Sequence, residues 1–169
     1  MHIAIISGST RARSQSRRIA DHLAARLAAQ APTTTSDILD LAALKLPMWD
    51  EAMWEKGSDA QARWAPIAER LRACQGFVMI SPEWGGMVAP AVKNFLLHCG
   101  ADDLGHKPGL ITAVSSGRGG AYPVAELRMS GYKNTHILWL PDHVIVRDAE
   151  KLDLAADPAV EPTLARIDY

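Results

Sequence analysis

Short apolar runs alternate along the chain with longer stretches in which apolar residues recur at helical spacing. Strands are expected where a run of apolar or β-branched residues ends in turn residues. The predicted strands cover 3–6, 36–41, 76–80, 110–114 and a fifth stretch in two pieces, 137–140 and 144–146, separated near Pro141. The predicted helices are one through Ile19, Leu23 and Leu27, with Ser14 or Ser16 as its cap, and others at 59–74, 89–98 and 122–129.

This alternation of strand and helix predicts an α/β protein with a parallel sheet and helices on both faces. A length of 169 residues suits one domain with a real core, so we interpret 1–169 as a single domain. One position conflicts with the pattern. Pro66 lies inside the second predicted helix, so we expect the first part of that helix to be broken or to start late.

The loops richest in Gly and Ser follow the first, third and fourth predicted strands, beginning at Ser7, Ser81 and Ser115. In open parallel sheets, ligands bind outside the carboxyl ends of the strands. We therefore expect the binding site at this edge.

The first loop, SGSTRARSQSRR, places arginines around the start of a predicted helix, where the helix dipole favours negative charge. A bound phosphate would explain them. Backbone N–H groups, the hydroxyls of Ser9, Ser14 and Ser16, and the Arg11 guanidinium are suitable donors. The alternative is that the serines only cap the helix and the arginines are solvated. No P-loop and no GxGxxG pattern is present, which disfavours ATP chemistry.

The second loop, SPEWGGM, combines the flat ring of Trp84 with Gly85 and Gly86, where a planar ligand could approach the backbone. The third loop, SSGRGGAYP, offers amides for the edge of such a ring. Alternatively, Trp84 fills core volume and the glycines only turn the chain. Together the three loops suit a mononucleotide-type ligand.

Composition narrows the class of protein. The net charge of −1 argues against a general nucleic-acid binder, and no stretch is long and apolar enough to span a membrane. Cys74 and Cys99 form no CxxC and suit buried thiols, so we expect a cytoplasmic protein. No metal-ligand spacing, GxSxG elbow or acid–base pair is evident, so we predict no metal and no catalytic side chain. This suits a site whose chemistry belongs to a cofactor.

Three segments resemble the NADPH-dependent FMN reductases. GSTRARSQSRRIA resembles the family's GSxRxxSxN loop, with Ser16 in place of the usual Asn. SPEWGGMVAPAVKNFLLH resembles PEYNxxxPxxxKNxxD, and KPGLITAVSSGRGG resembles the KP and SxGxxGG segment. LPMWDE also resembles the family's LPxxDE stretch. The resemblance runs from Ile3 to about Lys151.

The resemblance implies a flavodoxin-like three-layer sandwich with a five-stranded parallel sheet of order 2-1-3-4-5. It also implies bound FMN and hydride transfer from NAD(P)H through FMN to a flavin, quinone or similar small acceptor. Family members commonly form homodimers or homotetramers. The implied cofactor-binding residues are Ser9, Arg11, Ser14, Ser16, Pro82, Glu83, Trp84, Gly85, Ser115, Gly117 and Gly120.

The chain departs from the family pattern at three positions: Trp84 replaces Tyr, Gly85 replaces Asn, and His98 stands where Asp is common. We also expect the last helix to be short or truncated, with a partner subunit or further chain covering the sheet face it would leave open. A tryptophan-rich stretch follows the second strand. Its residues Trp49, Met53, Trp54 and Trp64 suit a subunit interface, a wall of the flavin pocket or local packing.

Two other functions remain open at this point. A flavodoxin-like FMN-binding electron carrier without NAD(P)H turnover would share the loops. Such carriers tend to be strongly acidic, whereas this chain is nearly neutral, which favours the enzyme. A phosphate-ligand binder that has lost flavin is the other alternative, suggested by Gly85.

Overall fold

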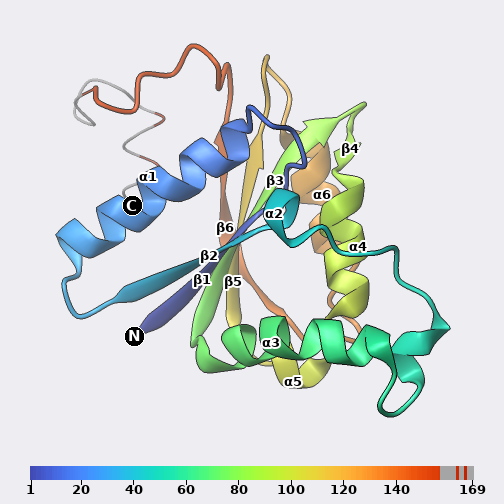
Figure 1. Ribbon diagram of the computed structural model, residues 1–169. Helices are drawn as coiled ribbons and strands as arrows, with labels where there is room; N and C mark the ends of the chain where they lie inside the picture. Colours follow the sequence, from blue (N-terminus) through green and yellow to red (C-terminus); the bar gives the residue numbers. More distant parts are fainter. Residues whose placement is uncertain (157–162, 164–165, 167–169) are drawn as a thin grey trace.

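Five long strands run parallel in the part of the chain that the structure, a computed structural model, describes: residues 1–156, 163 and 166 (Figure 1). They pair in the order β2-β1-β3-β5-β6. The strands are β1 (His2–Ser7), β2 (Thr35–Asp40), β3 (Gly76–Trp84), β5 (Pro108–Val114) and β6 (Leu138–Val146). Counting these five strands along the chain confirms the predicted order 2-1-3-4-5.

A short strand, β4 (Met87–Val88), lies outside this parallel arrangement. It pairs antiparallel with the end of β3, Glu83 opposite Val88 and Trp84 opposite Met87. The sequence analysis did not predict this hairpin. It continues β3 past Pro82, the last β3 residue with a partner in β5.

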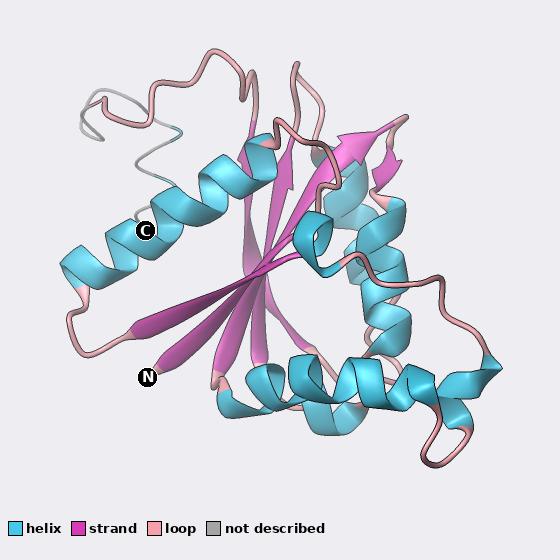
Figure 2. Cartoon of the chain, viewed as in Figure 1, coloured by secondary structure: helices cyan, strands magenta, loops and turns pink. Residues whose placement is uncertain are grey.

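Helices cover both faces of the sheet and complete a flavodoxin-like three-layer arrangement (Figure 2). On one face α1 buries Ile19, Ala20 and Leu23, while α3, α4 and α6 pack against the other. The described helices are α1 (Gln15–Gln30), α2 (Leu41–Leu44), the 3-10 turn η1 (Glu51–Trp54), α3 (Asp59–Ala73), α4 (Pro90–His98), α5 (Ala101–Leu104) and α6 (Ala121–Met129). None of them is long and apolar enough to cross a bilayer. The predicted short final helix falls largely on residues 157–162, 164–165 and 167–169, which lie outside the described residues.

The expectation of a broken second helix is wrong. Helix α3 runs without a break from Asp59 to Ala73 and contains Pro66. Pro66 lies on the exposed side, so water can satisfy the carbonyl that loses its N–H partner. The opposite side buries Trp64, Ile67 and Leu71 in the core, and this packing outweighs the local cost of the proline.

The fifth strand is also more continuous than predicted. β6 forms one strand that includes Pro141, and its pairing with β5 is irregular between Gly109 and Ile111. β6 is at the edge of the sheet, where a residue without an N–H group does not break a ladder on both sides. The proline therefore changes the register of the strand without ending it.

An ion pair between β2 and α3 should make stability depend on pH. Arg70 donates from Nε and Nη2 to the two carboxylate oxygens of Asp37, each at 2.7 Å. This hydrogen bonding lowers the pKa of Asp37. The ion pair therefore stabilises the folded protein at neutral pH, and this stabilisation is lost as pH falls below about 4 and the carboxylate becomes protonated. Because the pair is partly exposed, we expect Asp37→Asn to cost about 0.5–1 kcal/mol in the free energy of unfolding at pH 7.

Urea unfolding at pH 7 and pH 3 checks this, with Glu69→Gln on the exposed side of α3 as the control. The difference in the free energy of unfolding between the wild type and Asp37→Asn should be smaller at pH 3 than at pH 7. A difference that is equal at both pH values contradicts the prediction.

Candidate functional site

The loops after β1, β3 and β5 meet at one edge of the sheet because these strands are parallel. A narrow cleft lies between them. Six of the predicted site residues line it: Ser9, Arg11, Ser16, Pro82, Glu83 and Trp84. The sequence analysis did not single out five further lining residues: Arg13, Gln15, Val114, Ser116 and Glu150. The other predicted residues lie outside the lining: Ser14, Gly85, Ser115, Gly117 and Gly120.

The first loop offers hydrogen-bond donors at the start of α1. The Oγ of Ser14 accepts the Arg17 N–H at 2.9 Å and caps the helix, which confirms one of the two predicted caps. Ser16 is buried beside the cleft, and its Oγ has no hydrogen-bond partner among the described residues. A buried hydroxyl without a partner is costly unless a ligand satisfies it. No acidic residue lies in the first turn, so the positive end of the helix dipole is uncompensated.

The arginines of this segment divide into two groups. Arg17 pairs with Asp21 and Asp40, and Arg18 donates to the carbonyls of Ala149 and Leu152. These two arginines therefore hold α1 against its neighbours.

Arg11 and Arg13 line the cleft instead. Arg11 forms no ion pair with a carboxylate within the described part of the chain. Its Cζ lies 5.4 Å from the centroid of the Trp84 ring, a cation–π contact. Ser9, Ser16 and the two arginines form a donor set that fits a phosphate group.

The second loop is the tip of the β3–β4 hairpin. Gly85 and Gly86 have φ angles of +59° and +73° and form its two-residue turn, which requires positive φ at both positions. The positive φ angles explain why glycine occupies both positions of the turn, including position 85, where the family pattern has Asn. Trp84 directly precedes this turn and lines the cleft, so the conformation of the turn determines the position of the Trp84 ring.

Glu83 ties the second loop to the third. Its carboxylate accepts the N–H of Gly120, the residue before α6. A Cβ at Gly119 would lie 2.7 Å from a carboxylate oxygen of Glu83, so a larger residue there would require this carboxylate to shift. Glu83 therefore has a protein partner as well as a place in the cleft.

The third loop is held by the segment that follows β6. Asp148 donates its backbone N–H to Gly117 O at 2.8 Å, and Ala149 donates to Ser115 O at 3.0 Å. Arg147 donates from Nε to the carbonyls of Arg118 and Gly119, at 2.9 and 3.1 Å. The hydrophobic pattern does not identify Arg147, because the carbonyls to which it donates belong to residues 29 and 28 positions earlier in the chain.

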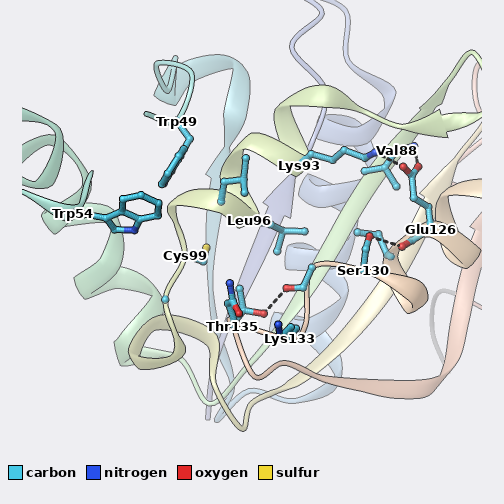
Figure 3. Close-up of a pocket in the computed structure, with 15 residues that line it drawn as sticks. Trp49, Trp54, Val88, Lys93, Leu96, Cys99, Glu126, Ser130, Lys133 and Thr135 are labelled. Carbon is cyan, nitrogen blue, oxygen red and sulfur yellow. Dashed lines mark hydrogen bonds and ion pairs between the residues drawn. The ribbon is translucent and has the colours of Figure 1, made fainter. Parts of the chain in front are cut away.

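A second and larger hollow, of about 650 Å³, lies between α4 and α6 and is here named the α4–α6 cavity (Figure 3). Leu96 and Leu97 of α4 and Leu127 of α6 line it, and the ion pair between Lys93 and Glu126 crosses its upper side in this view. The donor set of Ser9, Arg11, Arg13 and Ser16 lies in the cleft at the start of α1, whereas the α4–α6 cavity is lined mainly from α4, α6 and the loops beside them. We therefore place the candidate site in the cleft despite its smaller size.

The four residues of the tryptophan-rich stretch lie in three different environments. Trp64 is core packing and stacks on His98, with ring centroids 5.4 Å apart. Trp49 and Trp54 meet edge-on at the wall of the α4–α6 cavity, and Met53 packs partly buried against the core. These residues do not line the cleft, so the prediction of a flavin-pocket wall finds no support here.

Helix α4 fixes the loop that follows α2. Asn94 accepts the Trp49 N–H at 2.8 Å and donates to Pro47 O at 2.8 Å. His98 also contacts Pro47 O through Nε2 at 3.1 Å. His98, where the family often has Asp, thus has a structural place away from the cleft. No group of three or more His, Cys, Asp or Glu suited to a metal occurs in the residues described.

A parallel three-layer fold with a cleft at the carboxyl edge of its sheet is typical of the flavodoxin-like class of proteins. The family model for NADPH-dependent FMN reductase matches residues 1–151, and the chain belongs to that family. It is accordingly an NAD(P)H-dependent oxidoreductase that works with FMN. This decides between the enzyme and the electron carrier that the sequence analysis left open.

Individual relatives are distant. An NADPH azoreductase of Bacillus sp. (strain OY1-2) is 21% identical over 146 residues, covering 86% of this chain and 76% of its own length. An oxidoreductase from Corynebacterium diphtheriae superposes with a TM-score of 0.75 at 20% identity, covering 99% of this chain and 90% of that one. An apo NADH:FMN oxidoreductase gives a TM-score of 0.73 at 15% identity, with coverages of 99% and 84%. At these identities the two structures establish the fold alone.

Two glycines of the third loop should respond differently to substitution. Gly120 has φ +104°, and a Cβ there would lie 2.3 Å from Ile145 Cγ2, whereas a Cβ at Gly117 meets nothing within 4 Å. We expect Gly120→Ala to lower the free energy of unfolding by about 1–3 kcal/mol, and Gly117→Ala to change it by less than about 0.5 kcal/mol. Urea denaturation of the two variants and the wild type checks this, and equal stabilities would contradict it.

Proposed function

We propose that the cleft is the FMN site and that the first loop receives the phosphate. The observation that carries this is the buried Oγ of Ser16, which has no partner within the described residues and lies at the N-terminus of α1. Arg11 and Ser9 line the same cleft and add donors. Ser14, assigned to the site by the family motif, contributes by capping the helix that presents these donors.

We assign the isoalloxazine ring to the part of the cleft beside Trp84, whose ring also contacts the Arg11 guanidinium. The third loop reaches the cleft at Ser116, so we assign the edge of the ring to the backbone of this loop. Pro82 and Glu83 line the cleft beside Trp84. Gly85, Ser115, Gly117 and Gly120 act in this proposal through the shape of the two loops.

FMN held in this cleft would supply the hydride chemistry that links NAD(P)H to a second acceptor. The protein's own groups bind and orient it, and the proposal assigns no acid, base or nucleophile to a side chain. We propose a flavin, quinone or similar small planar molecule as the acceptor. The relative named an azoreductase and the structure named NADH:FMN oxidoreductase support this class. We also propose a cytoplasmic protein, since Cys74 and Cys99 are buried free thiols.

The absorbance spectrum tests this function directly. Purified protein, or protein mixed with FMN and desalted, should be yellow, and anaerobic NADPH should bleach the flavin band rapidly. NADH in a parallel cuvette shows the nucleotide preference. A yellow protein that stays yellow with both nucleotides contradicts the enzyme and supports a carrier, and a colourless one contradicts FMN binding.

Arg11 should carry much of the affinity for the phosphate. Arg11→Ala removes a charge-assisted hydrogen bond, and we expect FMN binding to weaken by about 1.5–3 kcal/mol. Fluorescence titration of FMN measures this, with Arg63→Ala on the exposed side of α3 as the matched control. Unchanged FMN affinity in Arg11→Ala would place the phosphate elsewhere.

We further propose a homodimer or homotetramer whose contact includes the face of α4 and α6. Two large apolar side chains that line the α4–α6 cavity are exposed, Trp54 at 76% and Leu97 at 58%, and helix α6 also exposes Tyr122 at 69% and Met129 at 76%. Exposed apolar side chains gathered on one face favour association over a free monomer.

Light scattering of the purified protein should give a mass of two or four chains. Leu97→Glu adds a charge on an exposed position of α4 and should shift the protein toward the monomer, whereas Arg63→Ala should not. A wild-type monomer that stays unaggregated would overturn this part of the proposal.

A further inference from the structure

The tip of the β3–β4 hairpin lies beyond the support of the main sheet. The last β3 residue paired with β5 is Pro82, so Glu83 and Trp84 have β4 as their ladder partner. β4 is two residues long and follows a turn of two glycines. So short a strand cannot by itself hold Trp84 in one place. Something else must anchor β4.

Helix α6 provides that anchor through Glu126. Its Oε2 accepts the N–H of Val88 at 2.6 Å, so the helix holds β4 at the residue opposite Glu83. Glu83 in turn accepts the N–H of Gly120, directly before the same helix. Each strand of the hairpin is therefore tied to α6 by one carboxylate.

The other oxygen of Glu126 pairs with Lys93 of α4, and Figure 3 shows this carboxylate between the Lys93 ammonium and Val88. Burial opposes the charged form, yet the hydrogen bonds from Lys93 and from the Val88 N–H lower the pKa of Glu126. The carboxylate thus stays ionised at neutral pH and accepts both bonds. We name Glu126, Lys93 and the Val88 N–H the hairpin clamp.

The hairpin clamp is separate from the cleft. Glu126 and Lys93 line the α4–α6 cavity, whereas Trp84 lines the cleft on the other side of the hairpin. Glu126 therefore acts on the cleft only through the position of β4. The sequence analysis did not single out Glu126, because its partners are distant in the chain. Val88 lies 38 residues earlier, and Lys93 belongs to α4.

We propose that Glu126 is a positioning residue for recognition of the flavin ring: through the Val88 N–H it sets where Trp84 stands, without contacting the ligand. This rests on the proposed FMN site. It assigns recognition of the phosphate mainly to Arg11 and recognition of the ring mainly to the hairpin clamp, with Arg11 and Trp84 in contact between them. A ligand that lacks the phosphate should still depend on Glu126, and a ligand that is only phosphate should not.

Three probes separate these two kinds of recognition: FMN, riboflavin and inorganic phosphate, each titrated by calorimetry or flavin fluorescence. Glu126→Ala should weaken FMN and riboflavin by a similar factor, about tenfold, and leave phosphate binding unchanged. Arg11→Ala should weaken the binding of FMN and phosphate by a larger factor than that of riboflavin, which loses only the effect of the Arg11 contact with Trp84. Glu126→Gln keeps an oxygen acceptor for the Val88 N–H, so it should recover most of the riboflavin affinity. Glu69→Gln, exposed on α3, is the matched control.

Hydrogen exchange in the flavin-free protein tests the anchor itself. The Val88 amide should exchange about tenfold faster in Glu126→Ala than in the wild type, with Glu126→Gln between them, and strands β1 and β5 should be unaffected.

The outcomes distinguish this inference from the proposed function. Riboflavin affinity that is unchanged in Glu126→Ala overturns the positioning role, and so does an equal loss for phosphate, since that indicates general damage. A wild-type protein that binds neither flavin defeats the proposed function, and the positioning role fails with it. If the Val88 amide exchanges at the same rate in Glu126→Ala as in the wild type, Glu126 does not anchor β4, whatever the flavin affinities are.

Discussion

The parallel alignment of the strands is the constraint on which the rest of the structure depends. Because β1, β3 and β5 point the same way, the chain leaves the sheet at one edge after each of them. The start of α1 and the β3–β4 hairpin therefore lie side by side, although 60 or more residues separate them in sequence. The cleft results from this arrangement, and the loops supply its chemistry.

Hydrogen bonds to backbone groups keep the loops in place. Glu83 joins the second loop to the start of α6, Glu126 joins α6 to β4, and Arg147 holds the carbonyls of the third loop. Backbone donors and acceptors that leave a sheet need such partners, because an unpaired polar group near the core is costly. The second and third loops are therefore connected to each other and to α6, while the Oγ of Ser16 in the first loop has no partner among the described residues.

The two hollows differ in chemistry. The cleft combines the Arg11 guanidinium with the Ser16 hydroxyl, which has no partner within the described residues, and this combination suits an anion. The α4–α6 cavity is surrounded by exposed apolar side chains such as Trp54 and Leu97, which suits contact with another chain. The hairpin lies between them, so its geometry links the two sides.

The sequence by itself determined the order of the main strands and helices and the position of the three loops, and it predicted an anion at the first loop, because these follow from local periodicity, helix capping and charge. Only the tertiary structure decided which arginines face the cleft, that α3 continues through Pro66, and that Glu126 reaches the Val88 N–H. Those outcomes depend on partners far away in the chain, which packing brings within hydrogen-bond distance and which no local pattern specifies.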